Sequence, residues 1–104
     1  REISDTGVAG SFGPPRMIGG VIRSLVPWSR LFADEEILLA INTDADAAHA
    51  AWVTIDATLQ AGRQTLTCLF ASEASLIGTS VPVESRNGRA AWLRLPAGGF
   101  VAYA

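Results

Sequence analysis

The chain has 104 residues, of which 49% are hydrophobic and 17% are charged, and its formal net charge is −2. This length is typical of one domain with one core. Its basic residues are all arginines scattered without a run, which argues against an electrostatic footprint for nucleic acid. A single cysteine excludes an internal disulfide and a C-x-x-C metal or redox pair.

The sequence also gives no sign of a membrane partner. No stretch approaches the ~18 apolar residues of a membrane span, and the first residues do not form a signal peptide. Cys68 alternates with Leu66 and Phe70, so we expect it to be a small buried hydrophobe. A lone cysteine is compatible with a reducing cytoplasm, the compartment that we favour. The chain begins without methionine, and we expect it to be a fragment of a longer polypeptide.

The first third of the chain predicts little regular structure. Glycines and prolines punctuate Arg1–Gly20 too often for a helix or a long strand, so we expect an ordered loop lying on a surface. In Gly20–Phe32 a helical face is conceivable, but Pro27 would break it, and we expect a short extended segment that turns at Pro27–Trp28. Residues 1–32 are therefore predicted to be an irregular connecting segment, and residues 33–104 a separate β-domain.

The stretch Glu36–Asp56 is predicted to be a β-hairpin around which the domain is organised. Period-two alternation in two runs, Glu36–Thr43 and Ala51–Asp56, indicates strands with one apolar face each. The residues that we expect in the core from these runs are Ile37, Leu39, Ile41, Val53 and Ile55.

The rest of the chain predicts more short strands separated by turns. The expected strands are Thr65–Ala71, Ser80–Glu84, Arg89–Leu95 and Phe100–Tyr103. Pro82 restricts its strand to a sheet edge, and Asn87-Gly88 is a strong hairpin signal. The pattern predicts an all-β fold: an antiparallel β-sandwich with Greek-key connections and an irregular N-terminal segment.

Polar residues in the chain offer no convincing reaction centre. Asp44-x-Asp46 resembles the start of a calcium loop, but the sixth and twelfth positions hold His49 and Ile55 in place of glycine and glutamate. The candidate acid–base carboxylates are more typical of solvated turns; they are Asp34, Glu35, Glu36, Asp44, Asp46 and Asp56. We therefore expect no catalytic residue, no metal site and no cofactor.

The three tryptophans are the candidate site residues. Alternation places Trp52 and Trp92 on the faces opposite the core, and Trp28 lies beside Pro27 in the entry segment. An outward tryptophan needs a covering group. That group could be a neighbouring domain, a stacked sugar ring, or strand and loop residues of the same domain.

Three segments together resemble one protein family. FGPPRMIGGVIRSLVPWSR, EILLAINTD followed by AWVTID, and LRLPAGGFVAYA look like the C-terminal β-domain of alpha-amylase-family glycoside hydrolases. The resemblance implies a non-catalytic accessory domain that packs on and stabilises the catalytic (β/α)8 barrel of the same polypeptide, whose catalytic residues lie outside this chain. It implies a parent enzyme that hydrolyses or transglycosylates α-glucans, and an uncovered face that could self-associate. The alternative is a carbohydrate-binding module whose tryptophans stack on glucose rings.

Overall fold

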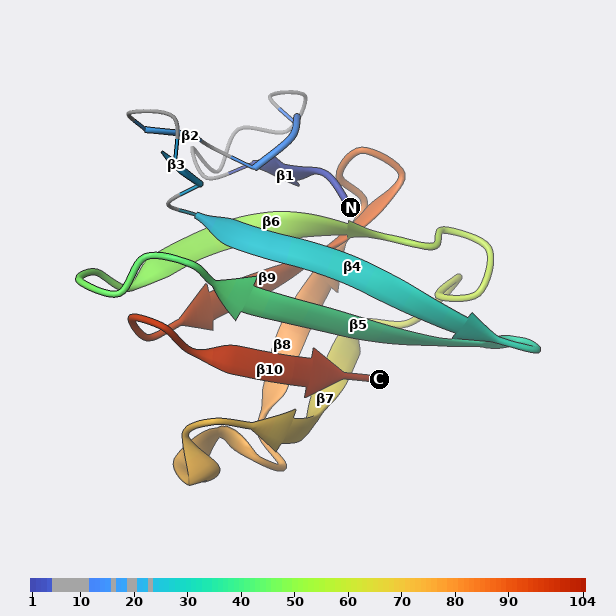
Figure 1. Cartoon of the computed structure of the whole chain (residues 1–104). Coiled ribbons are helices and arrows are strands. Elements are labelled where there is room, and N and C mark those ends of the chain that lie inside the picture. The colour runs from blue at the N-terminus through green and yellow to red at the C-terminus, as the bar shows by residue number, and fades with distance from the viewer. Residues whose placement is uncertain (5–11, 16, 19–20, 23) are drawn as a thin grey trace.

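The computed structural model describes residues 1–4, 12–15, 17–18, 21–22 and 24–104. Eight strands form one antiparallel sheet in the order β1-β6-β9-β8-β7-β10-β5-β4 (Figure 1). They span β1 Ile3–Ser4, β4 Leu25–Phe32, β5 Glu35–Asn42, β6 His49–Ile55, β7 Thr65–Ala71, β8 Ser80–Glu84, β9 Arg89–Leu95 and β10 Phe100–Tyr103. A separate ladder pairs β2 (Met17–Ile18) with β3 (Val21–Ile22), and a 3-10 turn, η1, spans Ala74–Leu76.

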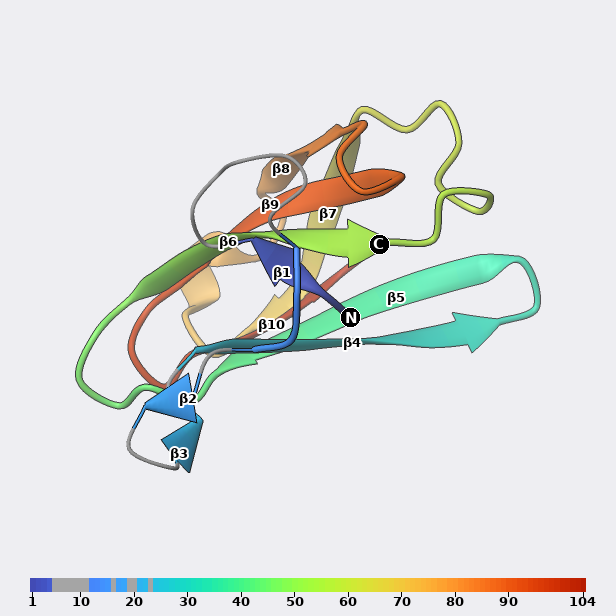
Figure 2. The same ribbon diagram turned by 90° about the horizontal axis from the view of Figure 1, so that it is seen from above.

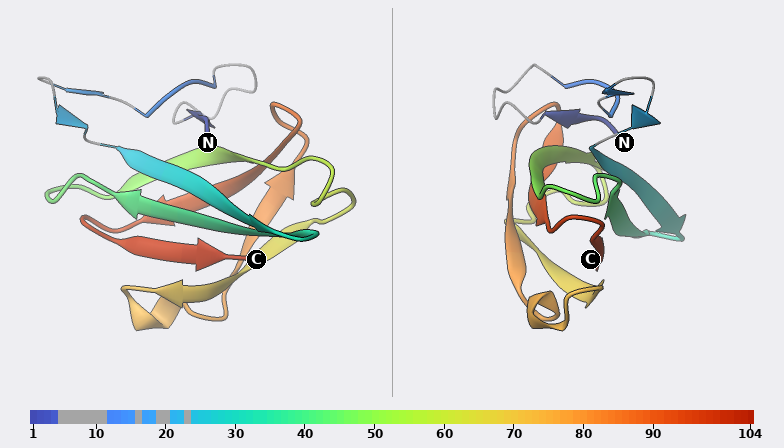
Figure 3. Two further views of the ribbon diagram at one scale, coloured as in Figure 1. Left: turned by 45° about the vertical axis from the view of Figure 1, so that its right-hand side comes forward. Right: turned by 60° about the vertical axis from the view of Figure 1, so that its left-hand side comes forward.

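The sheet curls into a nearly closed barrel. Strand β4 at one end of the strand order contacts β6 near the other end (Figures 2 and 3). Strands β7, β8 and β9 are neighbours in sequence and in space, and β10 returns to pair beside β7, which gives the Greek-key order β10-β7-β8-β9. The prediction of an all-β antiparallel fold is confirmed, and the two expected layers are the two sides of one continuous curved sheet.

The hydrophobic core lies inside this curved sheet. Its largest fully buried apolar side chains are Leu25, Leu38, Val53, Ile55, Leu66, Leu93, Leu95 and Val101. Cys68 is buried among them, as expected, and this burial raises the pKa of its thiol. The four predicted strands from Thr65 to Tyr103 are confirmed with the same bounds. Asn87 and Gly88 both have positive φ, 49° and 89°, in the β8–β9 turn.

The predicted hairpin at Glu36–Asp56 is wrong. Both of its strands exist, but β5 pairs with β4 and β10, whereas β6 pairs with β1 and β9. The connection at residues 43–48 therefore crosses from one side of the barrel to the other. Sequence proximity favoured local pairing, but the Greek-key topology places each strand between more distant partners.

The predicted inward face of β5 is also wrong. Leu38 and Ala40 are buried in the core, and the expected core residues Ile37, Leu39 and Ile41 lie on the outer face. The inward face includes Glu36 and Asn42, whose hydrogen bonds make their burial tolerable. Because β5 is apolar on both faces, alternation alone could not choose between them.

Phe70 was expected to share an inward face with Leu66 and Cys68, but its side chain is 55% exposed. The register between β7 and β10 shifts: Tyr103 lies opposite Cys68 and Ala102 lies opposite Phe70. The extra residue in β7, Leu69, forms a bulge that turns Phe70 outward and Ala71 inward.

The turn predicted at Pro27–Trp28 is absent, since β4 continues through both residues. Phe32 and Glu35 flank the two-residue β4–β5 loop and form a hydrogen-bonded pair, so alternation directs odd-numbered β4 residues away from β5. The nitrogen of Pro27, which lacks a proton, therefore faces the free edge of the sheet, where proline is tolerated. The boundary predicted between residues 32 and 33 lies inside this hairpin.

Strand β8 is an interior strand although Pro82 led us to expect an edge. Val83 donates its N–H to the Gln64 carbonyl at 2.9 Å, so the nitrogen of Pro82 faces β9. Pairing with β9 begins only at Val83, so no residue of β9 needs a hydrogen bond from the nitrogen of Pro82.

The predicted loop at Arg1–Gly20 lies partly outside the described residues. Within its described part, Ile3 and Ser4 add to the sheet by pairing with Val53 and Trp52. Ile3 and Gly13 also exchange backbone hydrogen bonds at 2.9 and 3.0 Å. Residues at the start of the chain are therefore part of the barrel.

Ala33 in the β4–β5 turn has a φ of 55°, a left-handed conformation that L-residues adopt at a cost of about 1–2 kcal/mol. Ala33→Gly should raise the free energy of unfolding by ~0.5–1 kcal/mol, because the relief exceeds the entropy that glycine adds to the unfolded chain. Urea denaturation measures the change. Ala97→Gly, in an exposed turn with negative φ, is the matched control and should lower the stability. Destabilisation by both variants would contradict the prediction.

Candidate interaction face

The outer surface of four neighbouring strands, β4, β5, β10 and β7, forms a continuous apolar face. Residues directly opposite in antiparallel ladders lie on the same face of the sheet. Val26 lies opposite Ile41, and Ile41 lies opposite Phe100. The next row runs from Trp28 through Leu39 and Ala102 to Phe70. We define the outer apolar face as Val26, Trp28, Ile37, Leu39, Ile41, Phe70, Phe100 and Ala102.

An aromatic cluster occupies the middle of this face. The ring of Phe100 lies 6.3 Å from Trp28 and 6.0 Å from Phe70, with interplanar angles of 48° and 57°. Both geometries are tilted contacts of the kind that aromatic rings prefer. Trp28 nevertheless remains 39% exposed and Phe70 55% exposed. The three rings therefore contact one another and still expose part of their surface to solvent.

Among the described residues, charged side chains flank the face near the tip of the β4–β5 hairpin. Arg30 lies opposite Ile37, and Phe32 lies opposite Glu35, near the tip of the β4–β5 hairpin. Phe32 is 78% exposed, the highest fraction among the large apolar side chains that the structure describes. Rows of apolar residues with so few charges are typical of surfaces that another molecule or domain covers.

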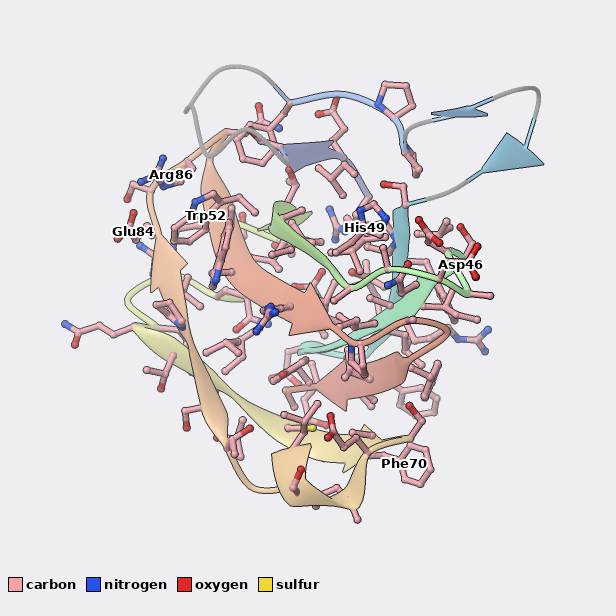
Figure 4. All side chains as sticks on the ribbon, turned by 90° about the vertical axis from the view of Figure 1, so that its left-hand side faces the viewer. Asp46, His49, Trp52, Phe70, Glu84 and Arg86 are labelled. Atoms are coloured by element: carbon pink, nitrogen blue, oxygen red, sulfur yellow. The ribbon has the colours of Figure 1, made fainter. Side chains whose placement is uncertain are left out.

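Trp52 and Trp92 form a separate pair on the outer side of β6 and β9. They lie opposite each other in the ladder, with ring centroids 5.4 Å apart and tilted by 56°. The Arg86 guanidinium lies 4.4 Å from the centre of a Trp52 ring, and Arg86 also pairs with Glu84 at 2.8 Å (Figure 4). Trp52 is only 8% exposed. Neighbouring strands and a loop of the same domain cover it.

The structure thus separates the three candidate tryptophans. Trp28 belongs to the outer apolar face, whereas Trp52 and Trp92 lie elsewhere on the barrel. Figure 4 shows Trp52 with Arg86 and Glu84 on one side of the molecule and Phe70 on another. Sequence reasoning missed Phe70 and Phe100 as partners of Trp28. No local signal identifies Phe100, because the pairing of β10 with β5 follows from the topology, and the bulge that exposes Phe70 has no local sequence mark.

Glu36 forms a buried polar centre at the hairpin end of the barrel. Its side chain is fully buried, and each carboxylate oxygen accepts two hydrogen bonds. Oε2 accepts from Arg1 Nη2 and Ser29 Oγ, both at 2.6 Å. Oε1 accepts from the Asp56 N–H at 2.9 Å and from Gln60 Nε2 at 3.2 Å. The carboxylate is saturated with donors, which is typical of a structural group.

Asp44 and His49 form a second polar pair at the β5–β6 connection. His49 Nε2 lies 2.9 Å from Asp44 Oδ2, and Asp44 Oδ1 accepts the N–H groups of Asp46 and Ala47. The hydrogen bond from His49, followed by the one from Asp46, lowers the pKa of the Asp44 carboxyl. Both contacts fix the loop. Among the described residues no cluster of three or more His, Cys, Asp or Glu side chains could hold a metal ion.

Comparison of the chain with protein-family models, curated proteins and solved structures gave no match. Among the described residues, no helix has the length and apolarity needed to cross a membrane.

Glu36→Gln should destabilise the fold by about 3 kcal/mol. An amide in this place must present its NH2 group to two of the four donors, and it leaves Arg1 without its carboxylate. Urea denaturation at neutral pH measures the loss. Glu35→Gln is the matched control, because the exposed Glu35 makes no ion pair in the described part of the chain. Equal unfolding free energies for the two variants would contradict the structural role of Glu36.

Asp44 should contribute to the acid limb of stability. Its pKa in the folded chain lies below the usual 3.8, so its contribution is present above that value and is lost as the pH falls through the folded pKa. Asp44→Asn should therefore lower the thermal midpoint at neutral pH, and the difference from the parent should shrink as the pH falls below 3.8. Asp34→Asn, in an exposed turn, is the control. A difference that stays constant with pH would contradict the linkage.

Proposed function

We propose that the chain is a non-catalytic accessory β-domain that packs through its outer apolar face on another domain of the same polypeptide. The observation that carries the proposal is the row of Trp28, Leu39, Ala102 and Phe70, whose two aromatic ends are exposed, with Phe100 beside it. Trp28 and Phe70 in the face, together with Phe32 at its rim, offer roughly 260–430 Å² of accessible surface. A stable interface buries about 800 Å² on each partner, so these rings supply a large share of one.

The partner domain in this proposal is a catalytic (β/α)8 barrel like that of alpha-amylase-family glycoside hydrolases. The sequence resemblance in three segments supports this identity. The helical outer ring of such a barrel could present the apolar ridges that a sheet face requires. The polar groups at the barrel's hairpin end and at the β5–β6 connection are consistent with an accessory role, since Glu36 and Asp44 are engaged in holding the fold.

A sugar-binding role remains the second candidate, and Trp28 is the residue that favours it. Trp28 is the one tryptophan among the described residues that is exposed and lies beside other exposed aromatic rings. Such rings can stack on the apolar faces of glucose units. The face has few hydrogen-bonding side chains to orient a sugar, and we therefore rank packing first.

The class of the parent enzyme is tested by the coding sequence upstream of Arg1. A (β/α)8 barrel with paired carboxylates encoded there would support the proposal, and a domain of another class would contradict it. The purified chain should not hydrolyse starch or maltooligosaccharides. Turnover by the chain alone would overturn the non-catalytic assignment.

The packing role is tested on the face itself. With its partner missing, the purified chain should self-associate at high concentration, and the double variant Trp28→Ser/Phe70→Ser should be monomeric in sedimentation equilibrium. Because both side chains are half exposed, the variant should keep its stability within about 1–2 kcal/mol. Ile77→Ser removes an equally exposed apolar residue outside the face and should leave association unchanged.

The same samples separate packing from sugar binding. Tryptophan fluorescence should not change on titration with maltooligosaccharides. A saturable change that Trp28→Ser abolishes would replace the packing role by a carbohydrate-binding one. A chain that stays monomeric at all concentrations and shows no fluorescence change with the sugars would contradict both the packing role and the sugar-binding role.

A further inference from the structure

One side chain of the β8–β9 turn bonds both the residue that precedes the first strand and the strand beside it. Asn87 Nδ2 donates to Glu2 Oε1 at 2.9 Å and to Thr54 Oγ1 at 3.0 Å. The Thr54 N–H in turn donates to the Glu2 carbonyl at 3.0 Å. Strand β1 pairs with β6 over only two positions, and the contacts of Glu2 extend this attachment by one residue. Figure 1 shows the β8–β9 turn beside β1.

The same side chain is chemically vulnerable. Asn87 and Gly88 are exposed, and glycine has no Cβ to hinder approach of its nitrogen to the Asn87 side-chain carbonyl carbon. Within the described residues the Gly88 N–H makes no hydrogen bond, so no ladder or turn contact keeps this nitrogen from reacting. Asn42, the other asparagine of the chain, is 1% exposed, precedes threonine, and donates its amide to the Ala47 and Pro96 carbonyls.

We propose that Asn87 is a site of spontaneous deamidation, and that its conversion to an acid weakens the attachment of β1 to the barrel. The Gly88 nitrogen loses its proton to solvent and attacks Asn87 Cγ, forming a C–N bond. The side-chain Nδ2 leaves from Cγ as ammonia after taking up a proton, which leaves a five-membered succinimide. Water then opens this ring at either carbonyl and gives aspartate or isoaspartate. No oxidant, metal or enzyme is required.

The product reverses the electrostatics of the contact. An amide that donated to the Glu2 carboxylate is replaced by a second carboxylate at the same place. Two like charges at hydrogen-bond distance repel each other, and the Thr54 hydroxyl can then serve only one of them as donor. The net charge of the chain falls from −2 to about −3. The succinimide intermediate also lacks the donor, so the contact is lost before the ring opens.

The modification is tested by incubating the folded chain at mildly alkaline pH and cleaving it after glutamate. This cleavage gives Ser85–Ala104, whose only asparagine is Asn87, and a separate fragment with Asn42. We expect the mass gain of one amide-to-acid conversion in the first fragment, isoaspartate in part of it, and no change in the second. Asn87→Gln should stay unmodified over the same time. The site would be overturned if Asn87 stayed intact in the folded chain while the urea-unfolded chain converted.

The structural consequence is tested with Asn87→Asp against Asn87→Ala, which removes the donor without adding charge. Hydrogen exchange at the Thr54 N–H reports the contact with Glu2. We expect exchange roughly tenfold faster in Asn87→Asp than in the parent chain, with Asn87→Ala between them. Exchange in Asn87→Asp equal to that of Asn87→Ala or of the parent would contradict the repulsion between the two carboxylates.

Discussion

The buried carboxylate of Glu36 connects parts of the chain that are otherwise far apart in sequence. Its donors come from the N-terminal residue Arg1, from strand β4 through Ser29, and from the β6–β7 connection through Asp56 and Gln60. A charge without water needs all of its lone pairs satisfied, and this requirement fixes the relative positions of these segments. The backbone nitrogen of Arg1 also donates to the Pro27 carbonyl at the free edge of β4. One polar centre thereby orders the hairpin end of the barrel and shields part of its sheet edge.

The second half of the fold could be predicted from the sequence because its signals are local. Asn87-Gly88 marks a turn with two positive φ values, and the strands from Thr65 to Tyr103 alternate cleanly between turn residues. The first half could not, since its decisive contacts are long-range. Pro27 reads locally as a strand breaker, and only its position at the sheet edge makes it harmless. The partners of β5 and β6 follow from topology, which no local pattern encodes.

The candidate site was predictable only in part, for a related reason. Trp28 was identified as a candidate site residue of the entry segment, with no sheet face assigned to it, and its side chain is partly exposed. Its neighbours Phe100 and Phe70 come from strands more than forty residues away, and a bulge in β7 decides the direction of Phe70. Alternation correctly placed Trp52 on the outer side of its strand, yet Trp92 and Arg86 cover it within the domain. Alternation predicts toward which side of the sheet a side chain points, whereas its solvent exposure depends on which other residues pack against it.

The error over β5 carries its own physical meaning. In a strand with one face in water, the inward positions are more apolar than the outward ones. In β5 the outward positions include Ile37, Leu39 and Ile41, whereas the inward ones include two polar groups, Glu36 and Asn42. Three large aliphatic side chains in a row beside an aromatic cluster are unusual on a surface that faces only solvent. The strand has the composition of one that is buried on both sides, and it is the composition of β5, more than any single exposed ring, that favours a partner on the outer apolar face.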